Sequence, residues 1–501
     1  MAAKRAYVWV AGVTLVAVAA IAVGAVMLFR SEWFRMENRP APDESPTTVW
    51  SEDASGVDGI GDPYTPEAGG TGYQVTHYDI SVEVDPVSHF IWGTTVLTVE
   101  ALGPLEELHL DLAQSVTTVT FDGGDVDFTH NGLDLRLTLP QPATPYQEYR
   151  VSVEYNGELE DMPYGLDQGV YLRVGEVLIA EEPHSCAVWF PCNDHPSDPA
   201  TYSIKATVPH DVEAISAGTW VDTQYGESWD LWIYAIDAPT VTYAVPLAVG
   251  QYTIDKDTVE IGGKSVQYFA AASDNGASFG SDGTEGALAY LRRSIAAADH
   301  LTTYLGEYPP NTLGGILPPM STSWGALETW GRPVYDPSCA RDGGWDEVLA
   351  HEISHFWFGD TITLAGWHDI VINEGMATYM EEYLAPGMTK AAADAWFYEQ
   401  IADTSPGFWA APLSDPGPDP ATFSGHVYDG GAMAIHATRQ LMGDDAFFEF
   451  LRAWAAQTGP HSLDEWRTMA QDYSPVDLAY AHAIWFDGTT RLTCSPEVGC
   501  P

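Results

Sequence analysis

The sequence HEISH at residues 351–355 constrains the fold more than any other part of the chain. On a helix, residues four positions apart lie one above the other on the same face, so the imidazoles of His351 and His355 can converge on one metal ion. Apolar residues recur around this stretch at helical spacing. Glu352 lies beside both histidines, where its carboxylate can accept a proton from water.

A third metal ligand is predicted at Glu374, nineteen positions after His355. Residues 372–379 have the pattern of the first turns of a second helix, which can return and present this carboxylate to the same ion. Two neutral imidazoles and one carboxylate, with one position left for water, are the ligands of a catalytic zinc site. The alternative reading, two surface histidines and a charge at a helix start, needs three coincidences at fixed spacing. The sequence therefore predicts one Zn²⁺ per chain, with Glu352 as general base.

The pattern of apolar residues changes along the chain and divides it into two folded parts. Period-two alternation, punctuated by Gly, Pro and Asn, is typical of half-buried antiparallel strands and predicts an all-β domain over residues 71–252. Helical spacing then dominates residues 253–480 and predicts a mainly α catalytic domain, followed by a tail over residues 481–501. The expected fold class is α+β and multidomain. The segments that carry these patterns are 78–84, 95–99, 108–110, 133–139, 151–155 and 202–208 for strands, and 286–304, 345–358, 372–384, 388–402, 430–442 and 444–456 for helices.

The N-terminus predicts export. Residues 7–29 form an apolar run long enough to cross a hydrocarbon core of about 30 Å. Lys4 and Arg5 precede the run and favour a cytoplasmic N-terminus, so residues 1–30 are expected to be a single-span membrane anchor or, alternatively, a cleaved signal sequence. The catalytic part is then extracellular at the cell membrane, or secreted. Residues 31–70 are acidic and rich in Pro, Gly and Ser, which is typical of a flexible tether.

The charge balance excludes one class of partner. The chain has 71 acidic and 20 basic residues and a net charge of −51. Nucleic acid and anionic membrane surfaces need positive charge, so neither is an expected partner. Two interpretations of the acidity stay open: solubility of a secreted protein, or adaptation to high salt, where mobile ions screen the self-repulsion.

The five cysteines fit an exported protein, in which disulfides persist. Cys186 and Cys192 share one short segment, Cys494 and Cys500 share another, and Cys339 is left over. These two pairings are suggested by proximity, but the connectivity stays open at this point.

The zinc motif and three other segments resemble one known family. HExxH, eighteen residues and then Glu374 in an Asn-Glu-Gly context are similar to the aminopeptidase N-type (M1, gluzincin) zinc metallopeptidases. Residues 325–329 (GALET) resemble the family's Gly-x-Met-Glu-Asn motif, residues 189–194 (WFPCND) resemble Phe-Pro-Cys-x-Asp, and residues 427–432 (VYDGGA) resemble the stretch with the catalytic tyrosine. The resemblance covers residues 73–470. It implies a β saddle or sandwich domain followed by a thermolysin-like domain, in a short form without the C-terminal helical domain of many relatives.

The resemblance also implies roles for single residues. Tyr428 would donate a hydrogen bond to the oxyanion of the tetrahedral intermediate. Glu328 and Glu182 would bind the α-ammonium group of the substrate, and Gly325 and Ala326 of the exopeptidase motif would also bind substrate.

Three positions depart from the family pattern and leave the geometry of substrate recognition in doubt. They are Thr329 for Asn, Gly430 for Lys and Ala180 for Gln.

Together these residues predict a zinc-dependent aminopeptidase that acts on peptides with free N-termini. Two other hypotheses stay open. One is a thermolysin-like zinc endopeptidase that uses the same metal. The other belongs to a different class: a catalytically weak surface module that binds peptides.

Overall fold

The structure is a computed structural model that describes residues 56–159, 169–275, 279–281, 283–322, 324–343 and 346–500. The predicted membrane anchor lies outside these residues, as does most of the predicted tether. Within the described part of the chain, no helix has the length and hydrophobicity needed to cross a bilayer.

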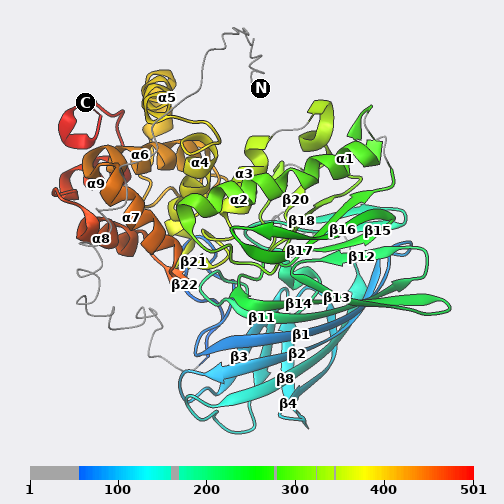
Figure 1. Ribbon diagram of the computed structural model, residues 1–501. Coiled ribbons are helices and arrows are strands. Elements are labelled where there is room, and N and C mark those ends of the chain that lie inside the picture. The colour runs from blue at the N-terminus through cyan, green and yellow to red at the C-terminus, as the bar shows by residue number, and fades with distance from the viewer. Residues whose placement is uncertain are drawn as a thin grey trace, which may run out of the picture. The chain divides into compact units, whose positions relative to one another are not determined.

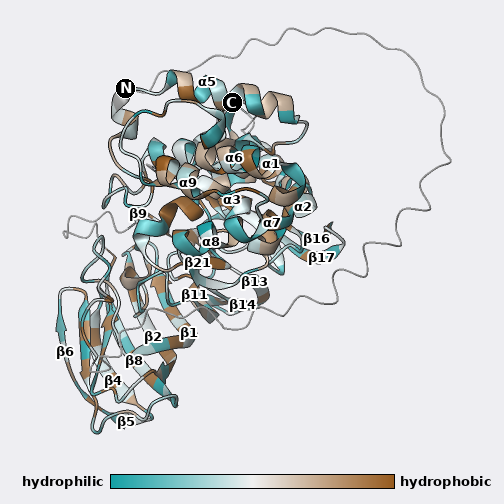
Figure 2. Cartoon of the chain, turned by 90° about the vertical axis from the view of Figure 1, so that its left-hand side faces the viewer, coloured by the Kyte–Doolittle hydropathy of each residue, from teal (hydrophilic) through white to brown (hydrophobic). Residues whose placement is uncertain are grey.

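The first part of the chain forms the expected β domain (Figure 1). Its largest sheet has eight strands in the spatial order β13-β14-β11-β1-β2-β8-β4-β5. Buried and partly exposed residues alternate along β1, and brown and teal patches alternate on the strands of this sheet in Figure 2. This alternation places one face against the core. The strand bounds are β1 Tyr73–Asp85, β2 Phe90–Ala101, β4 Ser115–Phe121, β5 Gly124–Asp125, β8 Glu148–Glu158, β11 Ala200–Pro209, β13 Thr219–Tyr225 and β14 Trp229–Thr240.

One strand pair differs from the antiparallel prediction. Strands β1 and β11 run parallel, with His77 opposite Thr201 and Glu83 opposite Thr207. The alternation of apolar residues reports which face of a strand is buried but not the direction of its neighbour, so the sequence could not reveal this pair.

Two smaller sheets complete the β domain. One has the order β3-β7-β6 and the other β12-β15-β10-β9. Strand β10 leads directly into residues 180–184, which reach the candidate active site described below. The bounds are β3 Glu107–Asp111, β6 Asp127–Asn131, β7 Asp134–Thr138, β9 Val170–Arg173, β10 Glu176–Ile179, β12 Glu213–Ser216 and β15 Leu247–Gly250.

The second domain combines a mixed sheet with helices. The sheet has the order β16-β17-β18-β20-β19, and helices α1 and α2 contact it (Figure 1). The sequence did not predict this sheet. Strand β18 is buried throughout and β19 and β20 have two residues each, so none of these three shows alternation, whereas the ten-residue strands β16 and β17 were missed. Its strands are β16 Tyr252–Ile261, β17 Lys264–Ser273, β18 Thr312–Leu317, β19 Ala326–Leu327 and β20 Val334–Tyr335, and a separate parallel pair consists of β21 Ile362–Leu364 and β22 Gly459–His461.

Helices occupy the segments in which helical spacing predicted them. The number of helices differs in two ways: residues 286–304 form two helices that meet at Arg293, and the two helices after residue 456, α8 and α9, were not among the predicted segments. The α-helices are α1 Gly283–Arg292, α2 Ser294–Leu305, α3 Asp346–Ser354, α4 Glu374–Glu382, α5 Lys390–Asp403, α6 Gly431–Met442, α7 Asp444–Ala455, α8 Leu463–Tyr473 and α9 Ala479–Phe486. Short 3₁₀ helices span Cys186–Val188, Pro337–Gly343, Trp367–Ile372, Pro406–Trp409 and Pro496–Val498, and a π-helix spans His426–Gly430.

The structure differs from two predicted boundaries. Helix α9 runs across residue 480, where the tail was expected to begin, and buries Trp485 and Phe486. Residues 56–70, which were assigned to the flexible tether, lie against the folded body, and Asp62 among them is buried. The composition of this segment is typical of a tether because it is polar and poor in apolar residues. Hydrogen bonds, rather than apolar side chains, hold it against the folded body.

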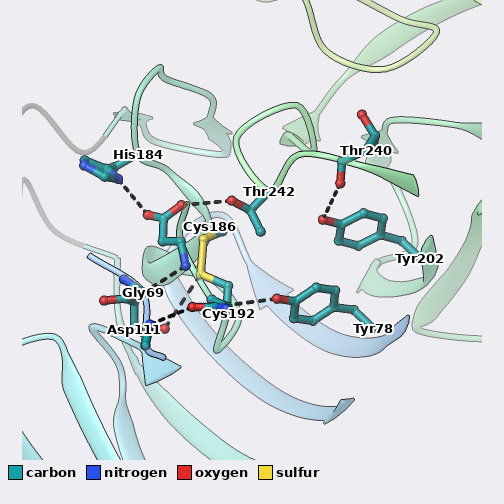
Figure 3. Close-up of a disulfide and its surroundings, with 12 residues drawn as sticks. Gly69, Tyr78, Asp111, His184, Cys186, Cys192, Tyr202, Thr240 and Thr242 are labelled. Atoms are coloured by element: carbon teal, nitrogen blue, oxygen red, sulfur yellow. Dashed lines mark hydrogen bonds and ion pairs between the residues drawn. A yellow bond between two sulfur atoms is a disulfide. The ribbon is translucent and has the colours of Figure 1, made fainter. Parts of the chain in front are cut away.

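Both suggested disulfides are present, and Cys339 is a free, buried thiol. The Cys186–Cys192 disulfide lies beside His184 and Thr242 (Figure 3). Cys192 also forms a β-bridge with Asp111, so this disulfide holds the segment after β10 against the β domain.

We predict that the buried histidine of α9 destabilises the fold in acid. Burial lowers the pKa of His482 to about 4, whereas the pKa of an unfolded histidine is about 6.5. As the pH falls below about 6.5, His482 is therefore protonated in the unfolded state but not yet in the folded state. Its contribution to the free energy of unfolding is complete above about pH 6.5 and is lost toward pH 4. The variant His482→Phe keeps a ring against Trp466 and Phe486 but cannot be protonated. Between pH 6.5 and 5, the free energy of unfolding of the wild type should fall by about 1 to 2 kcal/mol relative to this variant. Thermal unfolding of both proteins across this range measures it, and a constant difference would contradict it.

Candidate active site

Helices α3 and α4 pack against each other and bring the three predicted metal ligands together. Nε2 of His351 lies 3.3 Å from Oε2 of Glu374, and Nε2 of His355 lies 3.5 Å from the same oxygen. The three possible ligand atoms all lie within 4.8 Å of one another. The structure thus places one nitrogen from each histidine and one carboxylate oxygen around a single point.

Both imidazoles are oriented by partners on their other nitrogen. Nδ1 of His351 lies 2.8 Å from Oε2 of Glu381, and Nδ1 of His355 lies 2.6 Å from Oδ1 of Asn373. A proton on each Nδ1 leaves the lone pair of each Nε2 for a metal ion, which is the usual arrangement of histidine ligands. The donor set therefore fits Zn²⁺.

The carboxylate of this cluster is held in its anionic form. Burial would raise the pKa of Glu374, but His355 and His351 lower it to about 2. A charged carboxylate is the form that ligates a metal ion.

The predicted general base lies on α3 between the two histidines. Glu352 is 5% exposed, and its carboxylate belongs to a cluster with Glu328 and His355 whose nearest ligand atoms lie within 4.8 Å of one another. Burial raises the pKa of Glu352 to about 8, although His351 and His355 oppose the shift. A Zn²⁺ ion beside it would favour the carboxylate further. A basic carboxylate in this place can accept a proton from water.

A second group of carboxylates lies next to the metal cluster. Oxygens of Glu182, Glu328 and Glu374 lie within 4.8 Å of one another, and Oε1 of Glu182 is buried without a hydrogen-bond partner. Burial and the charge of Glu328 raise the pKa of Glu182. Such a group favours a cation, and an ammonium group supplies one together with hydrogen-bond donors.

Tyr243 contacts this group and was missed by the sequence analysis. Its hydroxyl donates to Oε1 of Glu328 at a distance of 3.1 Å. No local motif marks Tyr243, because it lies 85 positions from its partner. Glu381 was also missed, but a signal existed for it: it follows Glu374 by two helical turns on the same face.

Tyr428 lies at the metal cluster, as the resemblance implied. It is part of the π-helix, and its ring stacks on that of His351 at 5.9 Å and 19°. The glycine at residue 430 has a steric explanation, because the Cβ of any other residue would lie 2.7 Å from Nδ1 of His426. The lysine usual in the family would thus displace the His426 ring.

Gly325 and Ala326 line the same cleft. Ala326 begins β19, and Gly325 has a φ of +93°, a conformation that favours glycine. The cleft has a volume of about 610 Å³, within the range of small-ligand sites. Its lining residues are Tyr64, Thr65, Glu181, Glu182, Pro183, His184, Trp324, Gly325, Ala326, Leu327, Glu328, Cys339, Val348, His351, Glu352, His355, Trp367, Glu374, Glu381, Asp419, Thr422, Phe423 and Tyr428.

A metal cluster of this composition on two packed helices, at the floor of a cleft with a basic carboxylate, defines a zinc metallopeptidase. Two family models support this class. The Peptidase M1 N-terminal domain matches residues 74–244, and the Peptidase family M1 domain matches residues 302–470. The chain belongs to peptidase family M1, whose members are zinc-dependent hydrolases of peptide bonds.

Individual relatives agree with this assignment. The chain is 24% identical to aminopeptidase N of Lactococcus lactis subsp. lactis over 84% of this chain and 52% of the relative. It is 27% identical to glutamyl aminopeptidase of Mus musculus over 46% of this chain and 25% of the relative. The chain spans between about a quarter and a half of the length of these curated relatives.

Solved structures match over nearly their whole length. The M1 zinc metallopeptidase from Deinococcus radiodurans is 28% identical, with a TM-score of 0.77, and the match covers 87% of this chain and 98% of that one. A mutant of it bound to a Tyr-Ser-Ala substrate is 29% identical, with the same TM-score, over 88% and 100% of the two chains. These matches confirm the predicted fold class, a sheet-rich domain followed by a helical catalytic domain.

We predict that Glu381 tightens metal binding through His351. The variant Glu381→Gln should bind Zn²⁺ about ten-fold to a hundred-fold more weakly, because a weaker acceptor orients the imidazole less well and makes its Nε2 less basic. Competition with a chromophoric chelator measures the affinity. Glu382→Gln is the matched control, since Glu382 accepts a hydrogen bond from Trp396 instead. Equal zinc affinity of the two variants would show that the 2.8 Å contact has no such role.

Proposed function

We propose that this chain is an aminopeptidase that releases N-terminal residues from peptides with a free N-terminus. The observation that carries the proposal is the position of Glu182 and Glu328, whose oxygens lie within 4.8 Å of those of Glu374. An ammonium group held by this pair is close to the metal cluster. Only one residue then fits between the bound N-terminus and the carbonyl that is attacked.

Each protein group has a task in this reaction. Zinc, held by His351, His355 and Glu374, would supply a Lewis acid at the scissile carbonyl. Glu352 takes a proton from the attacking water and gives it to the leaving amine. The hydroxyl of Tyr428 donates a hydrogen bond to the oxyanion that develops on the carbonyl.

The solved relatives support the choice of substrate. The Deinococcus radiodurans structure holds Tyr-Ser-Ala, and structures of a two-domain M1 zinc metallopeptidase mutant hold L-arginine and L-tryptophan. All three ligands carry a free α-amino group. Among curated relatives, several are named as aminopeptidases.

The two other hypotheses are less favoured. An endopeptidase would have to place an uncharged backbone segment beside Glu182 and Glu328, which leaves buried carboxylates without a cation. A binding module would have no need of Glu352 beside the metal cluster. The combination of base, ligands and tyrosine in one cleft favours turnover.

We also propose that the protein works outside the cytoplasm, anchored by residues 1–30 or secreted after their removal. The disulfides Cys186–Cys192 and Cys494–Cys500 support this location, since such bonds persist in oxidising compartments. The proposed domain limits are 71–252 for the β domain and 253–480 for the catalytic domain, which helix α9 extends to Phe486.

A pair of peptides that differ only at the N-terminus tests the proposal. The zinc-loaded protein should release the first residue from a free tripeptide and leave its N-acetylated form intact, because acetylation removes the charge that Glu182 and Glu328 bind. Mass spectrometry of the products measures both reactions. Internal cleavage of acetylated peptides at a comparable rate would support the endopeptidase instead.

The role of Glu352 has its own test. Glu352→Gln should lower kcat by a hundred-fold to ten-thousand-fold, the contribution expected of a general base. Zinc content, measured by mass spectrometry of the metal, should stay at one ion per chain, because Glu352 is not among the three ligands. Activity within tenfold of the wild type would exclude this residue as the base.

A further inference from the structure

Residues 58–70, which precede strand β1 in the sequence, form a closed loop that we call the N-terminal loop. Its base is held by a β-bridge between Asp58 and Gly70 and by two backbone hydrogen bonds, from Gly59 to Gly69 at 2.9 Å and from Ile60 to Ala68 at 3.0 Å. The loop lies outside both family models, the first of which begins at residue 74. Its tip, residues 62–65, reaches the catalytic domain.

Asp62 fixes the tip to Trp367, which lines the cleft. Its side chain is 2% exposed. Oδ2 accepts a hydrogen bond from the backbone N–H of Trp367 at 2.7 Å and lies 3.2 Å from Nε2 of His195. Oδ1 accepts from the backbone N–H of Tyr64 at 2.8 Å. The carboxylate thus holds the turn of the loop and the start of the 3₁₀ helix Trp367–Ile372 together.

Tyr64 fixes the tip to a second segment of the catalytic domain. Its hydroxyl accepts a hydrogen bond from the backbone N–H of Gly417 at 2.8 Å and donates to the carboxylate of Asp415. Tyr64 and Thr65 line the cleft together with Asp419, Thr422 and Phe423, which follow in the same segment. The loop and this segment therefore form one continuous part of the cleft wall.

The side chains next to the loop are aromatic. The ring of Trp367 lies 6.4 Å from that of His184 and 6.5 Å from that of Phe423, measured between centroids. All three line the cleft, as does Tyr64. We call these four residues the aromatic wall: Tyr64, His184, Trp367 and Phe423.

The aromatic wall lies at the end of the cleft that binds the ammonium group. Trp367 also contacts the ring of Tyr243 at 5.9 Å, and the hydroxyl of Tyr243 donates to Glu328. In an amino acid the ammonium group and the side chain are attached to the same carbon atom. An N-terminal residue whose ammonium is held by Glu182 and Glu328 therefore directs its side chain into this part of the cleft.

We propose that the N-terminal loop completes a pocket for the side chain of the substrate's first residue, and that this pocket selects aromatic side chains. The proposal rests on the aminopeptidase function proposed above. Tyr64 supplies the outer face of the pocket, and its ring can pack against a substrate ring opposite Trp367 and Phe423. Asp62 is a positioning residue, since it contacts Trp367 through the backbone.

The charges of the cleft exclude acidic first residues. Seven carboxylates line it, and neither Lys nor Arg occurs among the lining residues that the structure describes: the acidic ones are Glu181, Glu182, Glu328, Glu352, Glu374, Glu381 and Asp419. His184 is paired with Asp194, with Nδ1 2.9 Å from Oδ2, so the pair offers no net positive charge. A glutamate or aspartate side chain would meet only repulsion there.

A panel of aminoacyl p-nitroanilides tests the pocket. For the zinc-loaded wild type, kcat/KM should be at least tenfold higher for the phenylalanine than for the alanine substrate and lowest for the glutamate substrate. Tyr64→Ala should reduce the ratio of kcat/KM for phenylalanine to that for alanine threefold to tenfold, mainly through a higher KM for the phenylalanine substrate. Tyr64→Phe keeps the ring and should keep the ratio within twofold.

Two results would overturn the proposal: an unchanged ratio in Tyr64→Ala, whether or not both substrates lose activity equally, or a glutamate substrate as good as phenylalanine. Thermal unfolding checks that each variant is folded. If Tyr64→Ala does not fold, Tyr64→Leu keeps apolar bulk without the ring and should lower the same ratio.

A binding experiment distinguishes a failure of the proposed pocket from a failure of the proposed aminopeptidase function. If the wild type hydrolyses none of the substrates, the aminopeptidase proposal fails. Calorimetry with free L-phenylalanine and L-alanine on zinc-loaded Glu352→Gln then tests the pocket without turnover. Tighter binding of L-phenylalanine that is lost in Glu352→Gln/Tyr64→Ala supports the pocket, and equal binding of the two amino acids overturns it.

Discussion

The convergence of His351, His355 and Glu374 on one point is the interaction on which the rest of the cleft depends. It places three buried carboxylates, Glu328, Glu352 and Glu374, and the partly buried Glu182 close together, which would be strongly unfavourable without cations. A zinc ion held by the two histidines and Glu374 would neutralise one side of this cluster. In the proposed function, the ammonium group of a substrate would neutralise the other side, and the carboxylates would then select for a charged N-terminus.

One helix organises most of the metal site. Glu374 and Glu381 lie two turns apart on α4, and Asn373 immediately precedes it. The first is a ligand candidate, and the other two hold the imidazoles of His351 and His355 through Nδ1. Because the three partners share one rigid element, α3 and α4 need only pack correctly for all of these contacts to form together.

The sequence predicted the parts of the fold and site that depend on short-range spacing. The helix with His351 and His355 follows from four-residue periodicity, and the strands of the β domain follow from alternation. The residues that were missed, among them Tyr243 and Asp62, act through contacts between distant segments. Asp62 and Trp367 are 305 positions apart, and no local pattern encodes such a pair. Composition was misleading at residues 56–70, because polar and glycine-rich sequence can be ordered by hydrogen bonds as well as left as a tether.

The N-terminal loop also shows why a polar attachment suits this position. Asp62 is almost fully buried and has three partners, so a partial release would leave a charged oxygen without compensation. The loop therefore docks as a unit, with Tyr64 bound to residues 415 and 417 at the same time. An apolar attachment of equal strength would need a larger contact area on the floor of the cleft. Hydrogen bonds need little contact area, so this attachment leaves Tyr64 and Phe423 among the residues that line the cleft, as the proposed pocket requires.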